Sequence, residues 1–305
     1  MNGLSEERLA PANGIEIAYQ EIGDRRGEPL LLIMGLGTQM IAWDERLCTM
    51  LAERGFRVVR FDNRDIGHST ILDGAGVPSR LDLILGRRAA APYLLSDMAA
   101  DTAGLMDHLG VEAAHIVGAS MGGMIAQTMA IERPERVLSL TSMMSTTGRR
   151  WMEFPTWRAF AVLMTPARRS RDAYIEQAVK TFRVIGSPDY PMDEERFRDV
   201  VSRSYDRGHR PSGVLRQMHA IAASGDRSQA LRRVTAPTLV IHGRKDPLAR
   251  PVGGRATAKA ISGARLRLIE GMGHDLPRQL WSTFVEEIAS NAARAGQAAK
   301  AEQAA

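Results

Sequence analysis

The sequence lacks several features that mark particular classes of protein. It has no apolar run of 18 residues or more, so it predicts no membrane-spanning helix and no stable membrane insertion. The first residues, MNGLSEERLAPANG, are charged and lack the apolar centre of a secretory signal, so we expect a soluble, cytoplasmic protein. The single cysteine, Cys48, has no partner for an internal disulfide and is expected to be a buried thiol.

Other absences bear on cofactors and nucleic acids. No group of His, Cys, Asp and Glu has the spacing of a metal site, and the stretch MGLGTQ lacks the third glycine and the acidic partner of a dinucleotide fingerprint. We therefore expect no metal and no cofactor. The isoelectric point is about 9.7, but only four of the 40 basic residues are lysine, and no basic stripe is interleaved with aromatic residues. Nucleic-acid binding is therefore not expected.

The excess of positive charge is confined to one segment. Residues 148–233 contain 17 Arg and Lys against 10 Asp and Glu, a net charge of +7 in a chain whose total is +5. Arg168, Arg169 and Arg171 form a cluster within this segment. Two interpretations stay open. The charge steers an anionic substrate, or it belongs to an arginine-rich surface that pairs locally with the interspersed acids.

The length and pattern of the chain predict a large α/β domain. A chain of 305 residues, 44% of them hydrophobic, can bury a substantial core, and we expect one domain with an insertion. Apolar runs alternate with helical patterns, which predicts a mostly parallel sheet flanked by helices. The expected strands are residues 15–23, 29–35, 56–62, 113–120, 136–145, 237–243 and 264–271. The expected helices lie near residues 39–54, 94–109, 121–133 and 277–294.

The strand pattern stops after about residue 146 and returns near residue 234. The segment 146–233 is helical in pattern and is interrupted by Pro-containing breaks, so we expect a helical cap inserted between two strands. The core is then expected to comprise residues 1–145 and 234–294. Residues 295–305 are rich in alanine and are expected to form a flexible tail.

The most informative motif is GASMGGMIA, residues 118–126, in which Ser120 stands in a G-x-S-x-G turn. The turn lies between an expected buried strand and an expected helix, which is the context that a nucleophilic serine requires. Small neighbours permit a sharp turn that exposes the hydroxyl, and the N-terminus of the following helix favours developing negative charge. A Gly-rich turn also packs closely for its own sake or holds a phosphate, so the interpretation depends on the partners of Ser120.

A nucleophilic serine needs a base and a carboxylate that orients the base. His274, in LIEGMGHDLP, follows the last expected strand, and Asp246, in VIHGRKDPLARP, follows the strand before it. All three residues lie at carboxyl ends of strands, where such sheets bind ligands, and their order along the chain is that of the triad on this kind of sheet. His219, in the expected cap, is the one other histidine considered to face a pocket.

The turn LLLIMGLGTQMIAW completes the expected site. Its backbone N–H at Leu36 is expected to join that of Met121 in an oxyanion hole. Apolar side chains that flank the motifs or open the cap are candidates for a substrate pocket, with ordinary core packing as an equal explanation. These candidates are Met40, Trp43, Met144 and Trp151.

Taken together, five motifs resemble the α/β-hydrolase superfamily over about residues 12–294: IMGLGTQMIAW, RFDNRDIGHS, GASMGG, TLVIHGRKDPL and IEGMGHDLP. The chain is most similar to the esterase branch that includes aclacinomycin methylesterase and actinobacterial lipase/esterase-type hydrolases. The resemblance implies the triad and oxyanion roles described above and a helical cap. Met34 stands where many members have histidine, and Asp65 where many have glycine. Asp62, Arg64 and Asp65 are expected to form a structural turn network.

The triad and the resemblance predict a serine hydrolase that cleaves carboxylic esters of small to medium lipophilic molecules through an acyl-enzyme. Members of the fold that dehalogenate or open epoxides have aspartate in place of Ser120. Two alternatives stay open. One uses the same triad on thioesters, lactones, carbon–carbon bonds or perhydrolysis, and the other is a weakly active ligand receptor built on the hydrolase fold. We expect a small-molecule ester as the partner, and a homodimer is left open.

Overall fold

The computed structural model describes residues 3–85, 87–149 and 154–303. Its centre is an eight-stranded sheet in the order β1-β2-β4-β3-β5-β6-β7-β8. The pairs β1–β2 and β2–β4 are antiparallel, and the other neighbours are parallel. The strands are β1 (Arg8–Ala12), β2 (Ile15–Ile22), β3 (Glu28–Ile33), β4 (Phe56–Phe61), β5 (Ala114–Ala119), β6 (Val137–Met143), β7 (Thr238–Gly243) and β8 (Arg265–Ile269).

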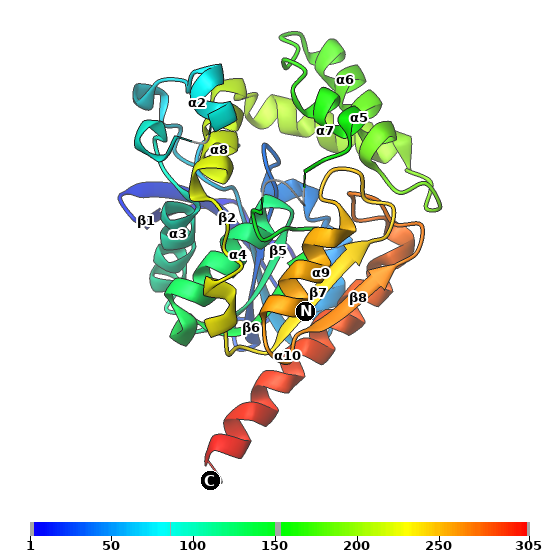
Figure 1. Cartoon of the computed structure of the whole chain (residues 1–305). Coiled ribbons are helices and arrows are strands. Elements are labelled where there is room, and N and C mark those ends of the chain that lie inside the picture. Colours follow the sequence, from blue (N-terminus) through cyan, green and yellow to red (C-terminus); the bar gives the residue numbers. More distant parts are fainter. Residues whose placement is uncertain (1–2, 86, 150–153, 304–305) are drawn as a thin grey trace.

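Each expected strand is present, and β1 is an additional strand at the edge of the sheet that the sequence did not predict. The helices are α1 (Glu45–Ala52), α2 (Arg80–Leu85), α3 (Leu95–His108), α4 (Met121–Glu132), α5 (Trp157–Leu163), α6 (Arg171–Ile185), α7 (Glu194–Gly208), α8 (Pro211–Ser224), α9 (Pro251–Ala260) and α10 (Trp281–Gln303). Residues 295–303, expected as a flexible tail, continue α10, which extends beyond the body of the molecule (Figure 1).

Two hydrophobic layers cover the two faces of the sheet. Successive side chains of a strand point to opposite faces, and β3 follows this rule. Leu31 and Ile33 pack with the buried face of α3 and α4, whereas Leu30 and Leu32 pack with α1 and α10. All four leucine and isoleucine side chains are fully buried. The sheet is therefore rigid on both sides, and the loops at its carboxyl end can be held in fixed positions.

The chain between β6 and β7 contains α5, α6, α7 and α8, together with a short 3-10 helix, Ala230–Arg233. In Figure 1, α5, α6 and α7 (green) lie beyond one end of the sheet, while α8 (yellow) lies beside α2. The backbone N–H of Thr156 donates to the carbonyl of Pro247, and that of His274 donates to Ile185. Because Pro247 and His274 follow β7 and β8, these helices cover the carboxyl end of the sheet. Among the described residues, no helix is both long and apolar enough to cross a membrane.

Candidate active site

Ser120 occupies a strained turn between β5 and α4. Its φ and ψ are 56° and −119°, a conformation that costs energy in a residue with a side chain. Glycines on both sides permit this geometry. A Cβ at Gly122 would lie 2.1 Å from the carbonyl oxygen of Ile33, and one at Gly118 would lie 2.1 Å from that of Gly122. The surrounding structure therefore imposes the strain that holds Ser120 at the end of the strand.

His274 connects Ser120 to Asp246. Its Nε2 lies 2.9 Å from Ser120 Oγ, and its Nδ1 lies 2.7 Å from Asp246 Oδ2. The other carboxylate oxygen of Asp246 accepts the backbone N–H groups of Leu248 and Ala249, both at 2.9 Å. With its proton on Nδ1, His274 donates to the buried carboxylate and presents a lone pair at Nε2 to the serine hydroxyl. The sequence named these three residues, and the structure brings them together in one hydrogen-bonded line.

Two backbone amides lie beside the serine. Met121 is the first residue of α4, and the first amides of a helix have no partner within the helix. Leu36 follows Gly35, and a Cβ at Gly35 would lie 3.1 Å from Ser120 Cβ, so this loop approaches the serine closely. Among the described residues, neither amide donates a hydrogen bond to another protein group. The part of the chain that the structure describes therefore does not occupy either amide, and their role in an oxyanion hole stays a prediction.

The helices of the insertion hold the loops of this site. Gln217 of α8 accepts the N–H of Gly37 at 2.9 Å, next to Leu36. Thr156, directly before α5, donates to Pro247, next to Asp246, at 2.8 Å. Ile185, the last residue of α6, accepts the N–H of His274 at 2.7 Å. Each loop that carries a site residue therefore has a direct hydrogen bond to the segment that covers it, except the Ser120 turn itself.

The loop of His274 also carries a buried carboxylate that the sequence analysis did not single out. Asp275 is only 8% exposed, and Ser187 donates to its carboxylate while accepting the N–H of Gly273 at 2.8 Å. Burial raises the pKa of Asp275 to about 6. The hydroxyl of Ser187 and the charge of His274 oppose that rise, whereas Asp246 adds to it. A second titratable group therefore lies directly beside the base.

The DNRD segment forms a buried network that joins the core to α7 and α8. Asp65 accepts two bonds from Arg216 of α8, at 2.7 and 2.8 Å, and a third from the hydroxyl of Tyr93 at 2.7 Å. Asp62 pairs with Arg207 of α7 at 2.9 Å. Arg64, which lies between them in sequence, forms two bonds of 2.6 Å with Asp101. These side chains form the structural turn network that the sequence indicated.

Three of the four apolar residues expected in a substrate pocket are buried. Met40, Trp43 and Met144 are 0%, 1% and 3% exposed, and Trp43 and Met144 belong to the core layer that packs against α1 and α10. Their burial agrees with the core-packing explanation, and a role in substrate binding stays a prediction. Trp151 lies outside the described residues. His219 is fully buried, and its Nε2 lies 3.1 Å from the carbonyl oxygen of Arg87 rather than at Ser120.

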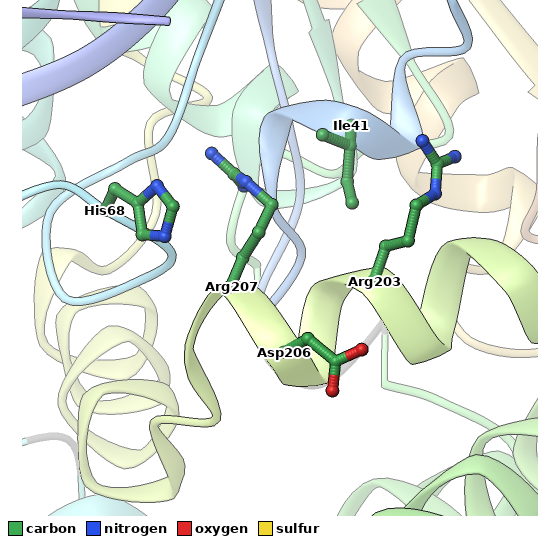
Figure 2. A pocket seen from close by; sticks show the side chains of 5 residues that line it. All are labelled: Ile41, His68, Arg203, Asp206 and Arg207. Carbon is green, nitrogen blue, oxygen red and sulfur yellow. The ribbon is translucent and has the colours of Figure 1, made fainter.

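Two cavities border the covering helices. One, of about 400 Å³, lies at the His274 loop, and its lining includes Phe182, Tyr190, Met192, Lys245 and Asp275. The other, of about 350 Å³, lies beside α7 and is shown in Figure 2. It is lined by Ile41, His68, Arg203, Asp206 and Arg207. The charges of the second cavity are balanced, because Arg207 pairs with Asp62 and with Glu7, which also contacts His68. Ser120 and His274 are not in either of these two linings.

The chain is similar to known proteins over most of its length. Residues 28–277 match the family described as alpha/beta hydrolase fold. The chain is 30% identical over 295 residues to rhodomycin D methylesterase DauP of Streptomyces sp. (strain C5) and to its counterpart DnrP of Streptomyces peucetius. Each match covers 88% of this chain and 92% of the relative. The enol-lactonase structure from Burkholderia xenovorans LB400 superposes with a TM-score of 0.71 at 24% identity, over 93% of this chain and 99% of that one.

The chain therefore belongs to the α/β-hydrolase family. Its sequence relatives place it among the esterases of that family.

Proposed function

We propose that the protein is a serine esterase that cleaves carboxylic esters of small to medium lipophilic molecules, with Ser120 as nucleophile, His274 as base and Asp246 as the orienting acid. The observation that carries the proposal is the hydrogen-bonded line from Ser120 through His274 to Asp246, with distances of 2.9 and 2.7 Å. The strained turn and the two available amides supply the other parts that acyl transfer requires.

The mechanism follows from these positions. His274 Nε2 removes the proton from Ser120 as Oγ attacks the ester carbonyl, and Asp246 stabilises the resulting imidazolium. The N–H groups of Leu36 and Met121 donate to the oxyanion of the tetrahedral intermediate. The alcohol leaves with a proton from His274. Water then attacks the acyl-enzyme while His274 accepts its proton. The acid is released as His274 returns a proton to Ser120.

Two features support the substrate class. The relatives named as methylesterases favour a small alcohol as the leaving group. The cleft at the His274 loop combines apolar and aromatic side chains, among them Phe182, Tyr190 and Met192, which suit a lipophilic acid portion. No step in this mechanism requires a cofactor.

The test is turnover of a series of p-nitrophenyl esters from acetate to palmitate, with a lactone and a thioester for comparison. We expect the highest kcat/KM on short to medium acyl chains, and His274→Ala should remove nearly all of it. His219→Ala is the matched control, because it removes a buried histidine that has no contact with Ser120, and it should retain turnover. A higher kcat/KM on the lactone or on the thioester than on the esters would indicate that compound class as the substrate. Stabilisation of the protein by a ligand together with negligible turnover would favour a ligand receptor over an enzyme.

A further inference from the structure

The helix α5 exposes an apolar stripe. Trp157, Phe160 and Met164 are 74%, 38% and 37% exposed, and their spacing of three and seven residues places them on one face of the helix. Phe154, 50% exposed, extends this stripe, because its ring lies 5.0 Å from that of Phe160. Ala159, on another face, is fully buried. Ala159 is thus the one fully buried residue of the helix, and both aromatic side chains of the helix are exposed to solvent.

The segment of chain that carries this stripe is basic. Residues 154–171 contain four arginines and no acidic residue. Arg171 pairs with Asp206 at 2.8 Å, but Arg158, Arg168 and Arg169 form no ion pair with any acid of the described residues. Elsewhere in the insertion the arginines of α6 and α7 have acidic partners, namely Arg183, Arg196, Arg198, Arg203 and Arg207. Ion pairs therefore account for the arginines of α6 and α7, whereas Arg158, Arg168 and Arg169 have no such partner among the described residues.

We propose that the α5 face, defined as Phe154, Trp157, Phe160 and Met164 with Arg158, Arg168 and Arg169, docks on an anionic lipid surface. Aromatic side chains partition to the headgroup level of a bilayer, and an apolar helix face enters the boundary of the acyl chains. Arginines without acidic partners are attracted to anionic headgroups. A nucleic acid fits less well, because the stripe ends in Met164 and lies along one short helix, whereas single strands are bound by basic grooves with a series of stacked aromatic side chains.

The α5 face lies close to the candidate active site, so docking would affect access of substrate to that site. Thr156, directly before α5, is hydrogen-bonded to Pro247, the residue after Asp246. The α5 face therefore lies next to a loop of the candidate active site. Docking there brings the site to lipophilic molecules that are dissolved in the lipid surface. Because the surface is a single short helix, binding is reversible and falls as salt screens the arginines.

The experiment is co-sedimentation of the full-length protein with two kinds of vesicle, phosphatidylcholine alone and phosphatidylcholine with phosphatidylglycerol at a ratio of about 3:1. We expect binding to the anionic vesicles to exceed binding to the neutral ones by about ten-fold or more, and to fall when salt rises from about 0.05 to 0.5 M. Trp157→Ser, and separately Arg158/Arg168/Arg169→Gln, should each lower the affinity by about ten-fold. Circular dichroism and the thermal midpoint verify that each variant is folded.

The matched control is Arg183/Arg198→Gln, which removes the same kind of charge from paired positions on α6 and α7 and should leave binding unchanged. Equal binding to neutral and anionic vesicles, no binding to either, or full binding by the two α5-face variants would overturn the proposal. So would loss of binding in the control, preferential binding of single-stranded DNA, or self-association through the α5 face. Because the readout is sedimentation, failure here is distinguishable from failure of the proposed esterase activity.

Discussion

The buried carboxyl of Asp275 makes the stability of this protein depend on pH in a specific way. Burial raises its pKa to about 6, above the ordinary value of 3.8. The folded state therefore binds this proton more tightly than the unfolded state does. The resulting stabilisation is complete below the ordinary pKa and is lost as the pH rises through about 6. The contribution of Asp275 thus decreases between acidic and neutral pH.

The magnitude follows from the two pKa values. A difference of about two units corresponds to about 3 kcal/mol between the fully protonated and fully ionised limits, of which about 1.4 kcal/mol falls between about pH 5 and pH 8. Asparagine keeps the size of the side chain and cannot ionise. The stability of Asp275→Asn relative to the native sequence should therefore rise by about 1.4 kcal/mol from pH 5 to pH 8, whatever the substitution costs at a single pH.

The assay is urea unfolding of both proteins at a series of pH values, followed by circular dichroism. Taking the difference between the two proteins removes the pH dependence of every group that they share. A difference for Asp275→Asn that is constant between pH 5 and pH 8, or that changes in the opposite direction, would show that burial does not raise the pKa of Asp275.

Three further predictions concern buried contacts. Arg216→Ala leaves the carboxylate of Asp65 buried without its partner and should lower the free energy of unfolding by about 3–5 kcal/mol. Arg203→Ala removes an exposed ion pair and should lower it by less than about 1 kcal/mol. Urea unfolding measures both values, and equal losses would contradict the prediction. Ser187→Ala removes the hydrogen bonds of Ser187 with Asp275 and Gly273 in the His274 loop. It should lower kcat for p-nitrophenyl acetate by about ten-fold or more, with KM little changed, because His274 is then held less firmly. An unchanged kcat would disprove this prediction. Burial raises the pKa of the Cys48 thiol to about 12, so iodoacetamide at neutral pH should label it only after unfolding, and rapid labelling of the native protein would be the contrary result.

The centre of the sheet could be predicted from the sequence because parallel strands such as β5 and β7 are buried on both faces and appear as apolar runs. β1 was not predicted because its sequence, RLAPA, is short, contains Pro11 and pairs only at the edge of the sheet. α9 was not predicted because PVGGRATAKA begins with proline and contains two glycines, which are typical of a loop. Both elements depend on their tertiary neighbours more than on local propensity.

Some residues of the candidate site could also be predicted from the sequence, and others could not. The order of Ser120, Asp246 and His274 could be predicted, because each residue follows a recognisable strand and the carboxyl ends of parallel strands share one edge. The contact of Ser187 with Asp275 could not, since it joins residues 88 positions apart and depends on how α6 docks on the core. The pocket residues could not be assigned either. Closeness to a motif in the sequence does not tell which face of a loop a side chain occupies, and Met40 and Trp43 are buried in the core.

The central claim is that Ser120 is a nucleophile activated by His274. The most direct measurement is the intact mass of the protein after reaction with a fluorophosphonate, followed by peptide mapping of the adduct. We expect one phosphonyl group on Ser120, a much slower reaction in His274→Ala and none in Ser120→Ala, whose ester turnover should fall by about a million-fold. An adduct on a different residue, or a Ser120→Ala variant that keeps more than about a tenth of the activity, would contradict the claim.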